Sequence, residues 1–191
     1  MTRRKVLAIC IIAMMFAPVA AMAQSPRLDV SELIPDIFDG PLSISASEFG
    51  DFSRGHSWTL DVDEAGKATL AIRFSPEGIK REFKISKSQL KDLRTAVANE
   101  RFFELKHYYG QLVPDSSETT ITIAAGKTKN TVALRFLMNW VHYDVAKLEE
   151  PARAIRVLNV IRGWFDDAEA VDLRKYDRMV LDAVDRRKSG K

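Results

Sequence analysis

The chain has almost no cysteine: a single residue in 191, Cys10. Cys10 lies inside an N-terminal segment that we expect to be removed, so the mature chain would contain no thiol. This absence excludes disulfide bonds, a cysteine nucleophile and a cysteine-ligated zinc ion. We expect an apolar core alone to hold the fold. Removing 23 of the 191 residues leaves 168, and a chain of that length buries roughly 70% of its surface on folding.

The sequence also lacks the strong signatures of catalysis and cofactor binding. It contains no Gly-x-Ser-x-Gly elbow, no His-Glu-x-x-His zinc motif, no phosphate-binding glycine loop and no dinucleotide fingerprint. Its three histidines, His56, His107 and His142, are far apart in the sequence, whereas a zinc ion needs three or four converging ligands. We therefore expect no cofactor and no bound metal.

No excess of charge of one sign remains once the N-terminal segment is set aside. The full chain has 29 Lys and Arg against 26 Asp and Glu, a formal net charge of +3. Removing Arg3, Arg4 and Lys5 from the 29 basic residues leaves 26, which equals the number of acidic residues. A neutral chain has no surplus of cations to replace the counterions of phosphates. We expect no nucleic-acid partner.

Residues 1–23 have the features of a bacterial signal peptide. Three basic residues precede an eleven-residue apolar run, Val6–Phe16, which is followed by a helix-breaking proline. Ala21 and Ala23 are the small residues that a signal peptidase accepts, so we expect cleavage before Gln24. The apolar run is shorter than the roughly 20 residues that cross a bilayer.

The signal peptide predicts a periplasmic or secreted protein with no transmembrane segment after cleavage. Arg3 and Arg4 also partly match a twin-arginine signal, so both the standard and the twin-arginine export route stay open. The sequence specifies no oligomeric state.

Apolar residues recur at every second position after an extended lead-in, residues 24–41. This period is typical of strands with one buried face. The strands are expected around residues 42–47, 58–62, 70–74, 79–85, 121–123 and 132–140. Short turns rich in Gly, Pro and Asp separate several of them, which favours an antiparallel meander.

Helical spacing replaces the two-residue period at three places. Ser86 and Gln89 form a capping box before an apolar stripe that ends near Asn99. Pro151 suits the first turn of a second helix. A third helix over residues 173–184 is expected to begin at an Asp166-Asp167 cap, before a solvated, frayed basic tail at residues 186–191.

These elements predict the α+β class. We expect an antiparallel sheet of about five to six strands with helices on one face, in two β-β-α-like halves, plus a C-terminal helical extension. The mature chain is expected to form a single α+β domain over residues 42–188.

Two stretches of the chain carry a resemblance to a known family. The first runs from Leu42 to Gly66 through Trp58-Thr59-Leu60, and the second from Leu90 to Ile121 through Phe102-Phe103, Tyr109-Gly110 and Pro114-Asp115. Over about residues 42–137 the chain resembles small exported bacterial domains of unknown function. Members often have a cysteine pair before the second strand, where this chain has none. The resemblance implies the order of sheet and helix and an exported location, and it implies no activity.

Aromatic side chains provide the candidate binding surface. Tyr108 and Tyr109 follow the first helix, and Trp140, His142 and Tyr143 follow the last strand. Tyr and Trp are frequent in interface hot spots. The alternative is that Trp140 completes the core face of its strand and that a tyrosine covers the edge of the core.

The missing catalytic motifs favour an exported, non-enzymatic binding protein. Its expected partner is another envelope protein or a wall component, and an inhibitor or immunity-type role fits the size and the neutral mature charge. A second alternative is an envelope-assembly factor whose basic tail, residues 186–191, contacts the membrane face.

The other alternative, which ranks ahead of the assembly factor, is a cell-wall glycan or peptide hydrolase. Its carboxylates would be Asp115 and Glu118 with Asp51, Asp61 or Asp63, beside a histidine. Such carboxylates must lie about 5 to 10 Å apart in a cleft, which is a geometric test.

Overall fold

A computed structural model describes residues 40–49, 57–73, 78–114, 116–165 and 171–190. The expected signal peptide, with its cleavage site at Ala21, Ala23 and Gln24, and most of the lead-in lie outside the described residues. So do His56 and the Asp166-Asp167 cap.

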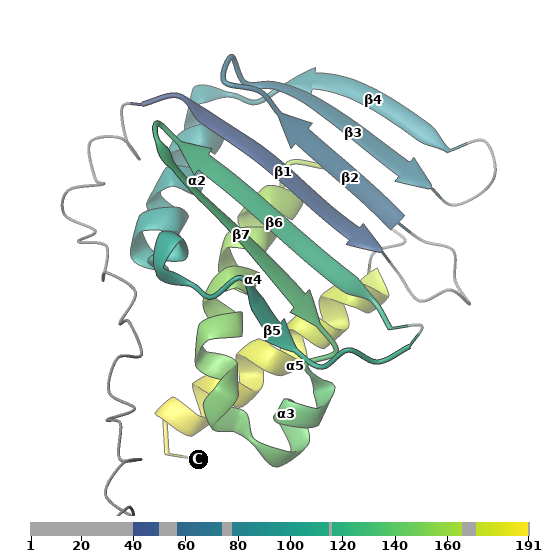
Figure 1. The fold of residues 1–191 in the computed structure, drawn as a ribbon, viewed down its shortest axis with the longest axis vertical. Helices are drawn as coiled ribbons and strands as arrows, with labels where there is room; N and C mark the ends of the chain where they lie inside the picture. Colours follow the sequence, from purple (N-terminus) through teal and green to yellow (C-terminus); the bar gives the residue numbers. More distant parts are fainter. Residues whose placement is uncertain (1–39, 50–56, 74–77, 115, 166–170, 191) are drawn as a thin grey trace, which may run out of the picture.

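Seven strands form a single sheet in the order β4-β3-β2-β1-β6-β7-β5 (Figure 1). Neighbouring strands are antiparallel except for β5 and β7, which are parallel. The strands are β1 (Leu42–Phe49), β2 (Ser57–Val62), β3 (Lys67–Arg73), β4 (Ile79–Lys84), β5 (Tyr108–Gly110), β6 (Glu118–Ala125) and β7 (Thr128–Arg135). The prediction of about five to six strands was too low, because the three-residue strand β5 has no periodic signal of its own.

Helices cover one face of the sheet, as predicted (Figure 1). The helical elements are α2 (Lys87–Asn99), η1 (Phe102–Glu104), α3 (Met138–Tyr143), η2 (Val145–Leu148), α4 (Glu149–Arg162) and α5 (Val171–Lys188). The capping box at the start of α2 is confirmed: Ser86 Oγ accepts from the Gln89 N–H at 3.1 Å, and Gln89 Oε1 accepts from the Ser86 N–H at 2.9 Å. α5 continues through Lys188, so the first half of the predicted frayed tail is helical.

The two-residue period of the sequence gives β1, β2, β3, β6 and β7 one buried face and one outer face. In β1, Leu42, Ile44 and Ala46 are buried, while the serines between them face away from the helices. α4 supplies the facing side of the core, where Ile155 and Leu158 are fully buried. Because burying one such side chain stabilises the fold by roughly 1.5–3 kcal/mol, the contact between α4 and the sheet is a main source of stability.

The predicted strand over residues 132–140 is wrong beyond Arg135. In the sheet register Arg135 is paired with Glu118, the first residue of β6, so the neighbouring strand ends there. The chain turns at Phe136, which has a φ of +23°, and continues as α3. Trp140 packs against the core from this helix instead of from a strand.

Candidate functional site

The structure divides the predicted aromatic surface into core residues and exposed residues. Tyr109 is only 4% exposed, and its hydroxyl accepts a hydrogen bond from the backbone N–H of Lys106 at 2.7 Å. Burial raises the pKa of the Tyr109 phenol well above its usual range. Trp140 is partly buried against the core. Both rings stabilise the fold, so neither presents its full face to a partner.

The other three predicted residues are exposed, and an aliphatic residue joins them. Tyr143 is 87% exposed and Tyr108 is 42% exposed, while Leu112, in the loop after β5, is 76% exposed. His142 is also exposed, and its ring lies edge-on to Tyr143 with 6.2 Å between the ring centroids. We call Tyr108, Leu112, His142 and Tyr143 the aromatic corner. Leu112 was not predicted from the sequence, because nothing in its neighbours marks it as exposed.

A hydrogen bond joins the two segments that carry the aromatic corner. Asn139 Nδ2 on α3 donates to Gln111 Oε1, in the loop after β5, at 2.6 Å. Leu112 directly follows Gln111, and Tyr143 lies one helical turn beyond Asn139 on the same side of α3. β5 and α3 are neighbours at the same end of the molecule (Figure 1). The fold therefore brings together two aromatic segments that are about thirty residues apart in the sequence.

Arg135 fixes the orientation of Tyr108. The guanidinium carbon of Arg135 lies 5.3 Å from the centroid of the Tyr108 ring, within the range of a cation–π contact. Arg135 Nε also donates to a carboxylate oxygen of Glu118. The hydrogen bond to Glu118 is the main cause that raises the pKa of Arg135. The ring of Tyr108 thus stacks on a side chain that is itself held in place.

The predicted hydrolase carboxylates do not pair in the described part of the chain. In the sheet register Asp61 is aligned with Thr122 through β1, and Thr122 is four residues from Glu118 along β6. Four residues of strand span about 13 Å, which exceeds the separation of a glycosidase pair. Asp63 instead accepts hydrogen bonds from two backbone N–H groups of its own turn. Asp51 and Asp115 lie outside the described residues.

The two described histidines lie on different parts of the fold. His107 Nδ1 lies 3.0 Å from the backbone oxygen of Thr131, and His142 lies on α3 in the aromatic corner. Within the described ranges, no group of three His, Cys, Asp or Glu residues is placed to hold a metal ion.

A buried ion cluster joins the sheet to the two C-terminal helices. Glu48 of β1 and Arg162 of α4 are each 2% exposed, and Arg162 Nη2 donates to Glu48 Oε2 at 2.7 Å. Trp58 Nε1 donates to the same carboxylate oxygen at 2.8 Å, and Arg162 Nη1 donates to Asp177 of α5. Burial raises the pKa of Asp177, and the charge of Arg162 only partly opposes this shift. The sequence held one signal for this cluster, an acidic residue at an inward position of β1.

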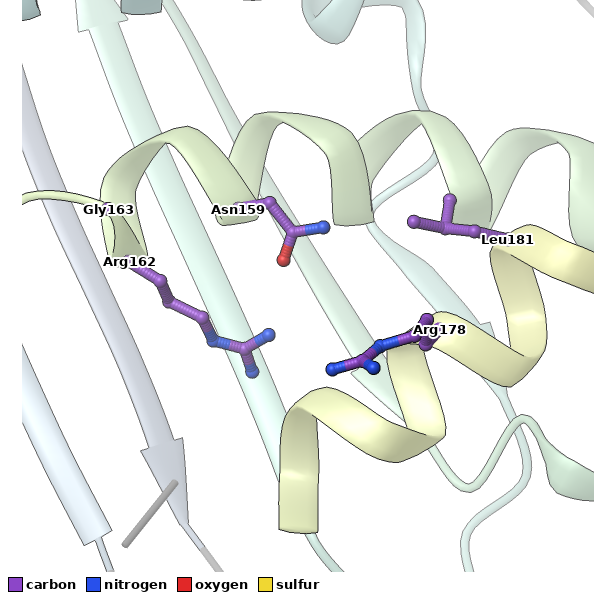
Figure 2. A pocket seen from close by; sticks show the side chains of 5 residues that line it. All are labelled: Asn159, Arg162, Gly163, Arg178 and Leu181. Carbon is purple, nitrogen blue, oxygen red and sulfur yellow. The ribbon is translucent and has the colours of Figure 1, made fainter. Parts of the chain in front are cut away.

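A cavity of about 260 Å³ opens beside this cluster, between α4 and α5 (Figure 2). It is lined by Asn159, Arg162, Gly163, Arg178 and Leu181. The guanidinium groups of Arg162 and Arg178 point toward one another across it (Figure 2). Arg162 Nε has no hydrogen-bond partner among the described residues. None of these five lining residues is an acid or a histidine, so they supply no acid–base pair.

No protein-family model matches the chain, and no curated protein matches it at a significant level. The resemblance to exported domains therefore stays a prediction. Across the described ranges, no helix is both long enough and apolar enough to cross a membrane.

Proposed function

We propose that this chain is an exported, non-enzymatic binding protein that contacts another envelope protein through the aromatic corner. The signal-type N-terminus supports a periplasmic or secreted location. The observation that carries the proposal is the exposure of Tyr143, Leu112 and Tyr108 at one corner of the fold. Exposed apolar side chains that are grouped in one region mark interaction sites, whereas singly scattered ones carry no such information.

The aromatic corner is prepared for binding because its support is already in place. β5 is paired with β7, and the Gln111–Asn139 hydrogen bond ties the loop after β5 to α3. Arg135 already orients the ring of Tyr108. A surface that is ordered before binding loses less conformational entropy when a partner docks. Tyrosines in such positions are typical anchors of protein interfaces.

An inhibitor or immunity-type role is the form of this function that we favour. A small chain with a neutral mature charge and no catalytic motif suits a protein that blocks or shields another envelope protein. Among the described carboxylates of the predicted hydrolase, Asp61 and Glu118 are too far apart to act as a pair.

Replacing two rings of the aromatic corner tests the proposal. The mature chain, immobilised, is expected to retain a partner from its own envelope extract, and Tyr108→Ala with Tyr143→Ala should weaken that binding about tenfold or more. Tyr176→Ala is the matched control, because Tyr176 is a 47% exposed tyrosine on α5, outside the corner. It should bind like the wild type.

The result depends on the double variant being folded, which its circular dichroism and urea midpoint will establish. A folded double variant that retains the same partner with unchanged affinity contradicts the proposed role of the corner. Capture of wall glycan instead of a protein, followed by its hydrolysis, contradicts the non-enzymatic class itself.

A further inference from the structure

Positive charge collects at one edge of the sheet, although the mature chain is expected to be neutral. Residues 78–94, which comprise β4 and the first part of α2, contain six Lys and Arg against two acidic residues. Arg73, at the end of β3, adds another cation beside them. Five of the six cations in residues 78–94 are exposed, and so is Arg73. We call these six exposed residues the basic edge: Arg73, Lys80, Arg81, Lys84, Lys87 and Lys91.

The cations of the basic edge are not neutralised within the described parts of the chain. None of the six side chains forms an ion pair or a hydrogen bond with another described residue. Glu82, the acidic residue of β4, pairs instead with Lys67 of β3 at 3.0 Å. Lys67 is also directly opposite Lys84 in the register, and like charges in that position destabilise a strand pair. An anionic partner would offset this repulsion.

β4 also offers an open backbone edge. It is the last strand in the sheet order, paired only with β3, and no other described element covers its outer side (Figure 1). An open edge of this kind accepts an added strand, because its outward N–H and C=O groups have no partner in the sheet. At the opposite edge, β5 has three residues against six in β4. β4 is therefore the longer template.

The two faces of β4 differ in a way that specifies the incoming strand. Lys80 and Lys84 lie on the face that carries no helix, since their register partners are the outward residues of β3. Ile79 and Phe83 lie on the helix-covered face, where Ile79 is exposed and Phe83 is half-buried. Glu82 lies between the two lysines, and Arg81 lies between Ile79 and Phe83. A strand laid against β4 would therefore meet mainly cations on one face and a mixed apolar and basic surface on the other.

We propose that β4 binds an extended acidic segment of a partner protein by strand addition. Alternate residues of the segment place carboxylates opposite Lys80 and Lys84 and apolar side chains opposite Ile79 and Phe83. The backbone supplies the pairing, and the charges select the partner. This surface is separate from the aromatic corner, because β4 and β5 are the two opposite edges of the sheet.

Edge lysines also protect sheets from unwanted pairing, and the experiment must separate that role from binding. The probe is a synthetic peptide that alternates glutamate and valine, added to the mature chain and followed by fluorescence anisotropy and amide hydrogen exchange. The proposal expects saturable binding that slows exchange of the β4 amides and weakens as salt is added. Lys80→Glu with Lys84→Glu should reduce the affinity by about tenfold or more.

Three controls decide the outcome. Lys127→Glu with Lys129→Glu makes the same charge change at two exposed positions at and just before the start of β7, and it should leave binding unchanged. A peptide of equal composition with its glutamates in one block should bind more weakly, and so should a peptide N-methylated at alternate residues. Equal binding of either peptide overturns strand addition in favour of general attraction to polyanions. Absence of binding by all peptides overturns the proposal and leaves the lysines as edge protection.

Discussion

Arg162 shows how one residue connects the sheet to both C-terminal helices. Its guanidinium reaches Glu48 on β1 and Asp177 on α5 from the last residue of α4. Each carboxylate has given up most of its hydration, which is expensive unless a charge and hydrogen bonds replace the water. The ion cluster therefore positions α5 against the sheet. Its charged side chains cannot be exchanged for one another.

The raised pKa of Asp177 makes the stability of the fold depend on pH. A carboxyl group with a raised pKa prefers its protonated form in the folded state, so folding takes up a proton. The stability that this carboxyl group contributes is fully present below its pKa in the unfolded state, 3.8. It is lost as the pH rises through the higher pKa of the folded state. Asp177→Asn keeps the shape and cannot ionise. Urea unfolding of both proteins between about pH 3 and pH 7 should show the wild type losing stability relative to Asp177→Asn as the pH rises.

The comparison with Asp177→Asn removes the contributions of titrating groups that do not interact with Asp177, because both proteins share them. A difference in unfolding free energy that stays constant with pH, or that moves in favour of the wild type at higher pH, contradicts the raised pKa.

At the level of elements, the edge strand β5 depends on a glycine. Gly110 has a φ of +100°, and a Cβ atom placed there would lie 1.6 Å from the backbone oxygen of Arg135 on β7. No side chain fits so close to a paired backbone. Only glycine allows this parallel pair, and the pair carries Tyr108 of the aromatic corner.

Gly110→Ala is expected to separate β5 from β7 and to destabilise the fold by about 2 kcal/mol or more. Equilibrium urea unfolding measures the loss, and amide exchange should be faster over residues 108–110. Gly190→Ala is the control, because Gly190 also has a positive φ, of +67°, but a Cβ atom placed on it would meet nothing within 4 Å. Similar losses for the two variants would show that the contact with Arg135 is unimportant.

Most elements were predictable because their periods are set by local sequence. The alternation in β1 and the capping box of α2 are examples, and both appear in the structure. β5 was not predictable, since three residues become a strand only when β7 lies beside them. α3 was missed because its residues continue the alternation of β7, and only the end of β6 at Glu118 forces the change to a helix.

The residue types of the candidate site could be predicted from the sequence, but which of those side chains are exposed could not. Aromatic enrichment marked five residues, and the fold alone decides that Tyr109 faces the core while Tyr108, next to it in β5, faces away. This follows from the alternation of strand residues once β5 exists. Glu48 shows the reverse case, since its inward position was visible in the sequence but its partners Arg162 and Asp177 come from distant helices.

Across the whole molecule, the two proposed surfaces lie at opposite edges of one sheet. The aromatic corner includes Tyr108 of β5, and the basic edge includes residues of β4, with five strands between β5 and β4. The ion cluster and the apolar core hold these edges in a fixed relation. On these two proposals, two partners, or two parts of one partner, would bind without competing for the same surface.

Hydrogen exchange of the mature chain, free and with its captured partner, decides whether the aromatic corner is the binding surface. We expect slower exchange on binding in residues 108–112 and 138–143, which hold the aromatic corner, and no change in α5 around Tyr176. Protection that appears elsewhere, while these two segments exchange as in the free protein, would contradict the proposed function.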